Sequence, residues 1–91
     1  MANVRVPSML RPTVGGERSV VAQGSTLREL INNVDRTHPG FAGQLLERNG
    51  DQRRFVNIYV NDEDVRYLQG LDTQVEEGDI VSILPAVAGG R

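Results

Sequence analysis

The sequence predicts an α+β fold in which one main helix crosses a mixed sheet of about five strands. An amphipathic helical pattern over residues 25–37, with β-branched stretches before and after it, carries this prediction. The size of the chain agrees with it. A chain of 91 residues with 38% hydrophobic and only 4% aromatic side chains suffices for one modest core of Val, Leu and Ile.

The first part of the chain predicts two strands joined by a hairpin loop. Residues 3–6 alternate apolar and polar side chains, which is typical of a strand with one buried face. Pro7 lacks the N–H that a sheet ladder needs, which indicates an edge position or a bulge. The Pro and Gly residues of 11–17 predict the loop, and residues 18–22 predict the returning strand.

The main helix has clear start and stop signals. Ser25 or Thr26 can accept hydrogen bonds from free backbone N–H groups, and Glu29 completes a capping box. His38 precedes Pro39, which disfavours the helical conformation at His38 and ends the helix there. The apolar residues recur at helical spacing and predict one buried face: Leu27, Leu30, Ile31 and Val34.

The middle of the chain predicts two more strands. A second, short helical turn is expected over residues 41–46, with Phe41, Leu45 and Leu46 as its apolar side chains. Residues 55–60 are rich in β-branched and aromatic side chains and form the clearest strand. A polar turn at 61–64 then leads into a short strand at 65–68.

The end of the chain predicts a last strand followed by a tail. A loop at 70–73 and a tight turn at 77–79 precede the strand at 80–84, and Pro85 ends it. We therefore expect a folded domain over residues 1–85 and a flexible tail over residues 86–91 that carries Gly89-Gly90. Fully extended, the five steps from Pro85 to Gly90 span about 17 Å, enough to enter a partner's active site.

Composition excludes several kinds of function. The chain has no Cys and one His, His38, so a thiolate nucleophile, a disulfide framework and a Cys or His metal site are not expected. Asp62, Glu63 and Asp64 are read as a hydrated turn, and no metal is assigned. The net charge of −2 argues against a nucleic-acid partner. Without a membrane span or signal peptide we expect a cytoplasmic protein.

The closing residues resemble a known family. The run 77–90, Glu-Gly-Asp-Ile-Val-Ser-Ile-Leu-Pro-Ala-Val-Ala-Gly-Gly, together with residues 57–61 and 70–73, is similar to the β-grasp sulfur-carrier proteins of the ThiS/MoaD type. These proteins are prokaryotic relatives of ubiquitin. Residues 54–66 and 84–90 look most like the actinobacterial carriers of cysteine biosynthesis. The resemblance implies a ubiquitin-like β-grasp fold over nearly the whole chain.

The resemblance also implies a function, that of a protein cosubstrate and not of an enzyme. A ubiquitin-activating-like adenylyltransferase would use ATP to adenylate Gly90, and the carboxylate would become a thiocarboxylate. Sulfur would pass to a cysteine synthase dependent on pyridoxal phosphate, or to an enzyme of secondary metabolism. A JAMM-type zinc metalloprotease would then release the product. The carrier itself would bind no cofactor. The residues expected to insert into partners are Pro85, Ala86, Val87, Ala88 and Gly89.

Arg91 departs from the family pattern, because it ties up the Gly90 carboxyl in a peptide bond. Either a JAMM-type protease removes Arg91 in the cell, or Arg91 is foreign to the natural chain. Two other functions stay open. One is the small subunit of a molybdopterin synthase, and the other is a ubiquitin-like protein modifier.

Two surface features are candidates for contact with partners. Phe55, Tyr59 and Tyr67 are candidates for an apolar docking patch for the activating enzyme, and the alternative is that they are core or sheet-face residues of strands. An acidic set is a candidate for steering a basic partner, with solvated turns as the default explanation: Asp62, Glu63, Asp64, Glu76, Glu77 and Asp79.

Overall fold

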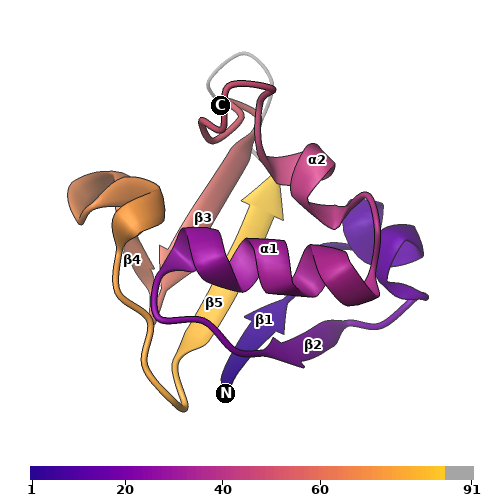
Figure 1. Ribbon diagram of the computed structural model, residues 1–91, viewed down its shortest axis with the longest axis horizontal. Coiled ribbons are helices and arrows are strands. Elements are labelled where there is room, and N and C mark those ends of the chain that lie inside the picture. Colours follow the sequence, from indigo (N-terminus) through magenta and orange to yellow (C-terminus); the bar gives the residue numbers. More distant parts are fainter. Residues whose placement is uncertain (86–91) are drawn as a thin grey trace.

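A computed structural model describes residues 1–85, and it confirms the α+β class: five strands form one mixed sheet that a helix crosses on one face (Figure 1). The strand order is β2-β1-β5-β3-β4. Strands β1 and β5 are parallel, and the other neighbours are antiparallel. The strands span Ala2–Arg5 (β1), Ser19–Ala22 (β2), Val56–Val60 (β3), Glu63–Asp64 (β4) and Ile80–Pro85 (β5).

Helix α1, Leu27–Thr37, begins and ends where the sequence predicts. Thr26 Oγ1 accepts a hydrogen bond from the Glu29 backbone N–H at 3.2 Å, and the Glu29 carboxylate accepts one from the Ser25 backbone N–H at 2.6 Å. These hydrogen bonds confirm the capping box. The Ser25 backbone N–H, and then the Ser25 hydroxyl, hold the pKa of Glu29 below its usual range. At the other end, His38 caps the helix with its N–H on the Val34 carbonyl.

The core lies between α1 and the sheet. The predicted helix face is buried, and the short helix α2, Phe41–Leu45, adds two fully buried side chains, Phe41 and Leu45. Strand side chains alternate, so β1, β3 and β5 each turn one row toward the helix. The core-facing residues of these strands are Ala2, Val4, Val56, Ile58, Val60, Val81 and Ile83.

The predicted hairpin is confirmed, because β1 and β2 pair antiparallel, but its connection is more than the simple loop expected at 11–17. Residues Ser8–Val14 form a 3-10 helix, η1, that places Leu10 and Val14 in the core with 1% and 0% of their surfaces exposed. Pro12 suits such a helix because its ring fixes φ near the helical value. Gly15, with φ of 69°, then ends the helix in the left-handed conformation. The segment thus closes one end of the core.

Pro7 occupies neither the edge position nor the bulge that the sequence predicts. Strand β1 lies between β2 and β5, and it ends at Arg5 before the proline is reached. Pro7 instead starts η1, where its carbonyl accepts a hydrogen bond from the Leu10 N–H at 2.9 Å. Its missing N–H therefore falls outside the sheet ladder.

The short strand predicted at 65–68 lies two residues earlier, as β4. Residues Val65–Tyr67 form a second 3-10 helix, η2, because the Asp64 carboxylate accepts a hydrogen bond from the Arg66 N–H at 2.9 Å and caps it. Val65 is fully buried and fixes this turn on the core. The loop predicted at 70–73 contains a third such helix, η3, over Gly70–Asp72.

Candidate functional site

The candidate site is the end of β5, where the predicted functional tail begins. Strand β5 lies between β1 and β3, and its last residue, Pro85, faces Val56 of β3. Pro85 is exposed, and Leu84 before it is 49% exposed. Residues Ala86, Val87, Ala88, Gly89, Gly90 and Arg91 lie outside the described part of the chain, so their roles stay predictions.

The register explains how a proline can end this strand. The Asn61 N–H donates to the Ile80 carbonyl at 2.8 Å, and pairs along an antiparallel ladder alternate between bonded and non-bonded. Counting along β3 from that bonded pair makes Val56 and Pro85 a non-bonded pair. The missing N–H of Pro85 therefore costs the sheet no hydrogen bond to β3. The Val56 carbonyl, which points away from β5, accepts hydrogen bonds from Gln52 Nε2 at 2.7 Å and Arg66 Nη2 at 3.0 Å.

The sheet face opposite α1 carries a row of polar side chains across four strands. The register aligns Ser19 of β2, Arg5 of β1, Ser82 of β5 and Tyr59 of β3. Paired residues share a face of the sheet, and the core takes the other face. The two serines are short, so they leave a depression between the longer side chains.

That depression belongs to a groove of about 670 Å³, which we call the arginine groove. Its lining combines three arginines, three hydroxyls, apolar side chains near the tail and one carboxylate: Arg5, Val6, Pro7, Arg11, Arg18, Ser19, Tyr59, Asp62, Ser82, Ile83 and Leu84. Arg11 Nε donates to the Val6 carbonyl at 3.2 Å, which fixes its guanidinium at the groove. Within residues 1–85, the ion pairs leave Arg5, Arg11 and Arg18 unpaired.

The three residues predicted to form a docking patch lie on different surfaces. Phe55, 71% exposed, directly precedes Val56 and so adjoins the tail end of β5. Tyr59 is half-buried and lines the arginine groove. Tyr67 is 88% exposed and lies in η2, where it lines a separate depression with Leu68. Contact of these residues with a partner stays a prediction.

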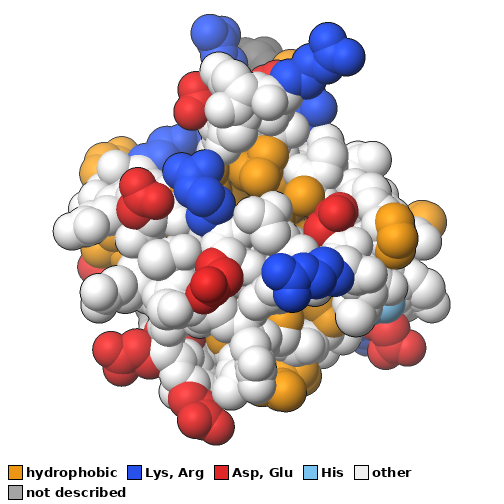
Figure 2. Space-filling model, viewed as in Figure 1, with side chains coloured by type: hydrophobic (Ala, Val, Ile, Leu, Met, Phe, Trp, Pro, Cys, Tyr) orange, Lys and Arg blue, Asp and Glu red, His pale blue; other side chains and the backbone are white. Residues whose placement is uncertain are grey.

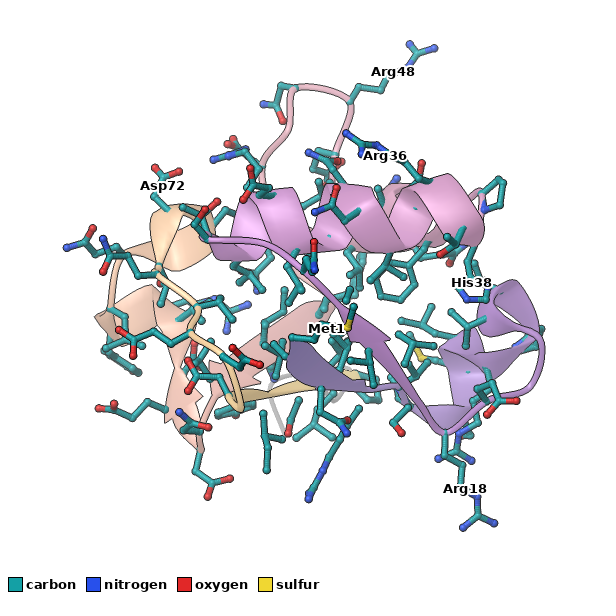
Figure 3. All side chains as sticks on the ribbon, turned by 60° about the horizontal axis from the view of Figure 1, so that its bottom comes forward. Met1, Arg18, Arg36, His38, Arg48 and Asp72 are labelled. Atoms are coloured by element: carbon teal, nitrogen blue, oxygen red, sulfur yellow. The ribbon has the colours of Figure 1, made fainter. Side chains whose placement is uncertain are left out.

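The described residues hold no other clear reactive constellation. Over residues 1–85 no three side chains of His, Asp or Glu gather as metal ligands would. No helix in the same range has the length and apolar character needed to cross a bilayer. His38 lies at the end of α1 (Figure 3).

A family model described as the ThiS family matches residues 4–90. The chain belongs to the ThiS family. The match ends at Gly90, and Arg91 lies outside it.

Individual members of the family are similar over nearly their whole length. The sulfur carrier protein CysO of Mycobacterium tuberculosis is 49% identical over 89 residues, which cover 96% of each chain. A chain in the crystal structure of the Amycolatopsis orientalis BexX/CysO complex matches with a TM-score of 0.92 and 47% identity, covering 99% of this chain and 100% of that one. The small archaeal modifier protein 3 of Haloferax volcanii is 34% identical over 80 residues, 85% of this chain and 86% of that protein.

These comparisons confirm the fold and function expected from the sequence. The fold is the ubiquitin-like β-grasp, and this ThiS-family chain is a sulfur carrier and not itself an enzyme.

Sequence reasoning missed the arginine groove. Arg5, Arg11 and Arg18 are six and seven residues apart, and only the pairing of β1 with β2 and the turn of η1 bring them together. The alternation that places Arg5 opposite the buried face was the one available signal.

Proposed function

We propose that this ThiS-family protein carries sulfur as a thiocarboxylate on Gly90 and delivers it to a biosynthetic enzyme. The observation that carries the proposal is the match of the family model through Gly90, at the end of a tail that follows the surface-exposed Pro85. Such a carrier needs an accessible terminus more than a catalytic pocket. Glycine suits that terminus because it has no Cβ to hinder passage through a narrow channel.

The chemistry proceeds in two displacements. A partner adenylyltransferase of the ubiquitin-activating type binds ATP. The Gly90 carboxylate attacks the α-phosphate of this ATP, and pyrophosphate leaves. A nucleophile at the oxidation level of sulfide (HS⁻) then attacks the acyl carbon of the adenylate, AMP leaves with the bonding electron pair, and the new thioacid loses its proton. The product is an anionic thiocarboxylate. ATP is thus a cosubstrate of the partner, and the carrier needs no bound cofactor of its own.

Arg91 must be removed before this chemistry, because its peptide bond occupies the Gly90 carboxyl. The family match supports this step, since it ends at Gly90 and leaves Arg91 outside. We propose a JAMM-type zinc metalloprotease for the cleavage. A protease of the same type would release the product after sulfur transfer.

The acceptor that we propose is a cysteine synthase dependent on pyridoxal phosphate. The 49% identity to a protein named CysO supports an acceptor in cysteine biosynthesis. The BexX/CysO complex of A. orientalis supports docking of such a carrier on a partner protein, and an acceptor from secondary metabolism is the alternative. Because activation consumes ATP, we propose that it takes place in the cytoplasm.

Pyrophosphate exchange with the adenylyltransferase of the same host tests the activation step. A chain ending at Gly90 should support exchange of pyrophosphate into ATP, whereas the chain ending at Arg91 should not. Gly90→Val in the shorter chain is the matched control, and its β-branched side chain should block the step without touching residues 1–85. Equal exchange with the longer chain, Arg91 still attached by intact mass, would contradict the proposal.

A second candidate function is protein modification. The 34% identity to the small archaeal modifier protein 3 of H. volcanii favours it. Its mark would be target lysines joined through an isopeptide bond to Gly90. The chain itself has no Lys, so it could modify itself only at its N-terminal amine. Mass spectrometry of tryptic peptides from the host distinguishes such conjugates from free thiocarboxylate.

A further inference from the structure

The last residues of β5, from which the tail leaves, are held mainly by β3. Strand β5 pairs with β1 only as far as Ser82. On the β3 side, the alternation that makes Val56 and Pro85 a non-bonded pair makes Asn57 and Leu84 a bonded pair. This pair is the last one of the ladder, because Pro85 has no N–H to donate. The position of Leu84 therefore depends on Asn57.

The outer edge of β3 has no neighbouring strand at this end. Strand β4 pairs only with the last two residues of β3, at the opposite end (Figure 1). Arg66 of η2 binds the free edge instead. Its Nη2 donates to the Val56 carbonyl at 3.0 Å, and its Nη1 donates to Asn57 Oδ1 at 2.5 Å. One guanidinium thus binds both β3 residues that pair with the end of β5.

Arg66 is itself fixed at its backbone and at its guanidinium. Asp64 Oδ1 accepts the Arg66 backbone N–H at 2.9 Å, and Asp64 Oδ2 lies 3.5 Å from Arg66 Nη1. Val65, between the two residues, is fully buried. Because the guanidinium is planar and its donors have a fixed arrangement, it can bind both acceptors with little further loss of freedom. Asp64, a candidate for steering a partner, is therefore engaged within the carrier.

We propose that Arg66 is a positioning residue for the tail, which acts by holding Val56 and Asn57 and so fixing where the tail leaves the sheet. The inference rests on the proposed function, because the tail has to bring Gly90 to the adenylyltransferase. Without Arg66 the last bonded pair opens more often, and the tail starts from a less defined point. Fewer bound carriers then place the Gly90 carboxylate in line with the α-phosphate, which lowers turnover more than binding.

A rival explanation is that Arg66 contributes only its charge. Basic side chains gather at the upper end of the molecule, toward which β5 runs (Figure 2), so loss of a positive charge could itself weaken activity. Arg66→Lys separates the two explanations. It keeps the charge, but an ammonium is a compact donor on a flexible stem and lacks the planar fork that binds two acceptors together. Charge alone predicts full activity for Arg66→Lys, whereas positioning predicts a partial loss.

Arg66→Gln is the main variant, and it should fold. The Val56 carbonyl keeps its hydrogen bond from Gln52 Nε2 at 2.7 Å, so the substitution leaves no described backbone acceptor of β3 unpaired. All variants are made in the chain that ends at Gly90.

Arg28→Gln is the matched control. Arg28 Nη1 donates to the Gly50 carbonyl at 3.2 Å, and its Nε lies 3.6 Å from Asp72. The side chains of Arg28 and Arg66 are 44% and 45% exposed. The control therefore removes the same charge, one carbonyl contact and one carboxylate contact, all of them outside β3 and β5.

Two measurements test the proposal. The first is hydrogen exchange at the Leu84 amide, with Ser82, the preceding bonded residue of the same ladder, as the internal reference. The second is kcat and the carrier KM of pyrophosphate exchange with the host adenylyltransferase. Arg66→Gln should speed hydrogen exchange at Leu84 about tenfold relative to Ser82. It should lower kcat about tenfold and leave KM within about twofold. Arg66→Lys should lie between, and Arg28→Gln should resemble the wild type in both.

Unchanged hydrogen exchange at Leu84 in Arg66→Gln would overturn the inference. Faster hydrogen exchange with an unchanged kcat would also overturn it, because Arg66 would then be a purely structural residue. A rise confined to KM would point to contact with the enzyme, and full kcat in Arg66→Lys would assign the effect to charge. No pyrophosphate exchange with the wild-type chain would overturn the proposed function itself, an outcome distinct from the others because it needs no variant.

Discussion

Asn61 and Asp79 join the turn after β3 to the start of β5 through a side-chain hydrogen bond of 2.9 Å. Asn61 Oδ1 also accepts a hydrogen bond from the Ile80 N–H at 3.0 Å, so one amide binds both sides of the strand start. Asn61 has φ of 50°, a left-handed conformation that asparagine tolerates better than most residues. The other carboxylate oxygen of Asp79 accepts from the Glu76 N–H at 2.8 Å. This cluster fixes where β5 begins and hence its register up to Pro85.

The Asp79 cluster predicts a dependence of stability on pH. The hydrogen bond from the Glu76 backbone, and then that from Asn61, hold the pKa of Asp79 below its usual range. A carboxyl with a lower pKa in the folded state stabilises the protein above its unfolded pKa of about 3.9, and the contribution is lost as pH falls through the folded value. Asp79→Asn should therefore lower the free energy of unfolding at pH 7 and reduce its decline in acid.

Urea unfolding at several pH values measures this effect. Glu76→Gln is the matched control, because it removes one carboxylate from the same turn and leaves the Glu76 N–H free to bind Asp79. The difference between wild type and Asp79→Asn should be largest at neutral pH and shrink toward pH 2. A difference independent of pH would show that the carboxylate charge at this position is irrelevant to stability.

The 3-10 helix η1 predicts a large cost for a substitution in a segment that resembles a loop in sequence. Leu10 is 1% exposed, so Leu10→Ala should lower the free energy of unfolding by about 2–5 kcal/mol. Met9, its neighbour, is 54% exposed, and Met9→Ala should cost less than about 0.5 kcal/mol. Chemical denaturation of both variants measures the contrast. Similar small costs would mean that this segment does not close the core.

Two glycines give opposite predictions for the same substitution. A Cβ on Gly24 would lie 2.6 Å from the Leu30 backbone nitrogen and 2.7 Å from its Cα, which are fixed by α1. Gly24→Ala should therefore cost about 1–3 kcal/mol. A Cβ on Gly43, in α2, meets nothing within 4 Å, and Gly43→Ala should stabilise by about 0.5–1 kcal/mol. Thermal unfolding of the two variants compares them, and a neutral Gly24→Ala would refute the close approach.

The parts of the fold that could be predicted from sequence are those with long local signals. The capping box at Thr26 and the four apolar side chains of α1 repeat at one spacing, and Val56–Val60 alternates over five residues. The closing motif through Gly90 predicted the β-grasp fold and the family. In each case several neighbouring residues indicate the same structure.

The wrong predictions concern elements that depend on distant contacts. A 3-10 helix such as η1 has too few residues for a visible period, and its Pro and Gly also suit a turn. The strand predicted at 65–68 is wrong because the Asp64 carboxylate caps the 3-10 helix η2, which begins at the fully buried Val65. The arginine groove depends on register between β1, β2 and β5, which no local pattern encodes.

The central claim is that Gly90 carries the sulfur. Intact-mass and terminal-peptide spectrometry of the protein, taken directly from its native host during active sulfur assimilation, tests it most directly. We predict a population that ends at Gly90, lacks Arg91 and has one terminal oxygen replaced by sulfur. A population that keeps Arg91, with no thiocarboxylate on any terminal residue, would contradict it.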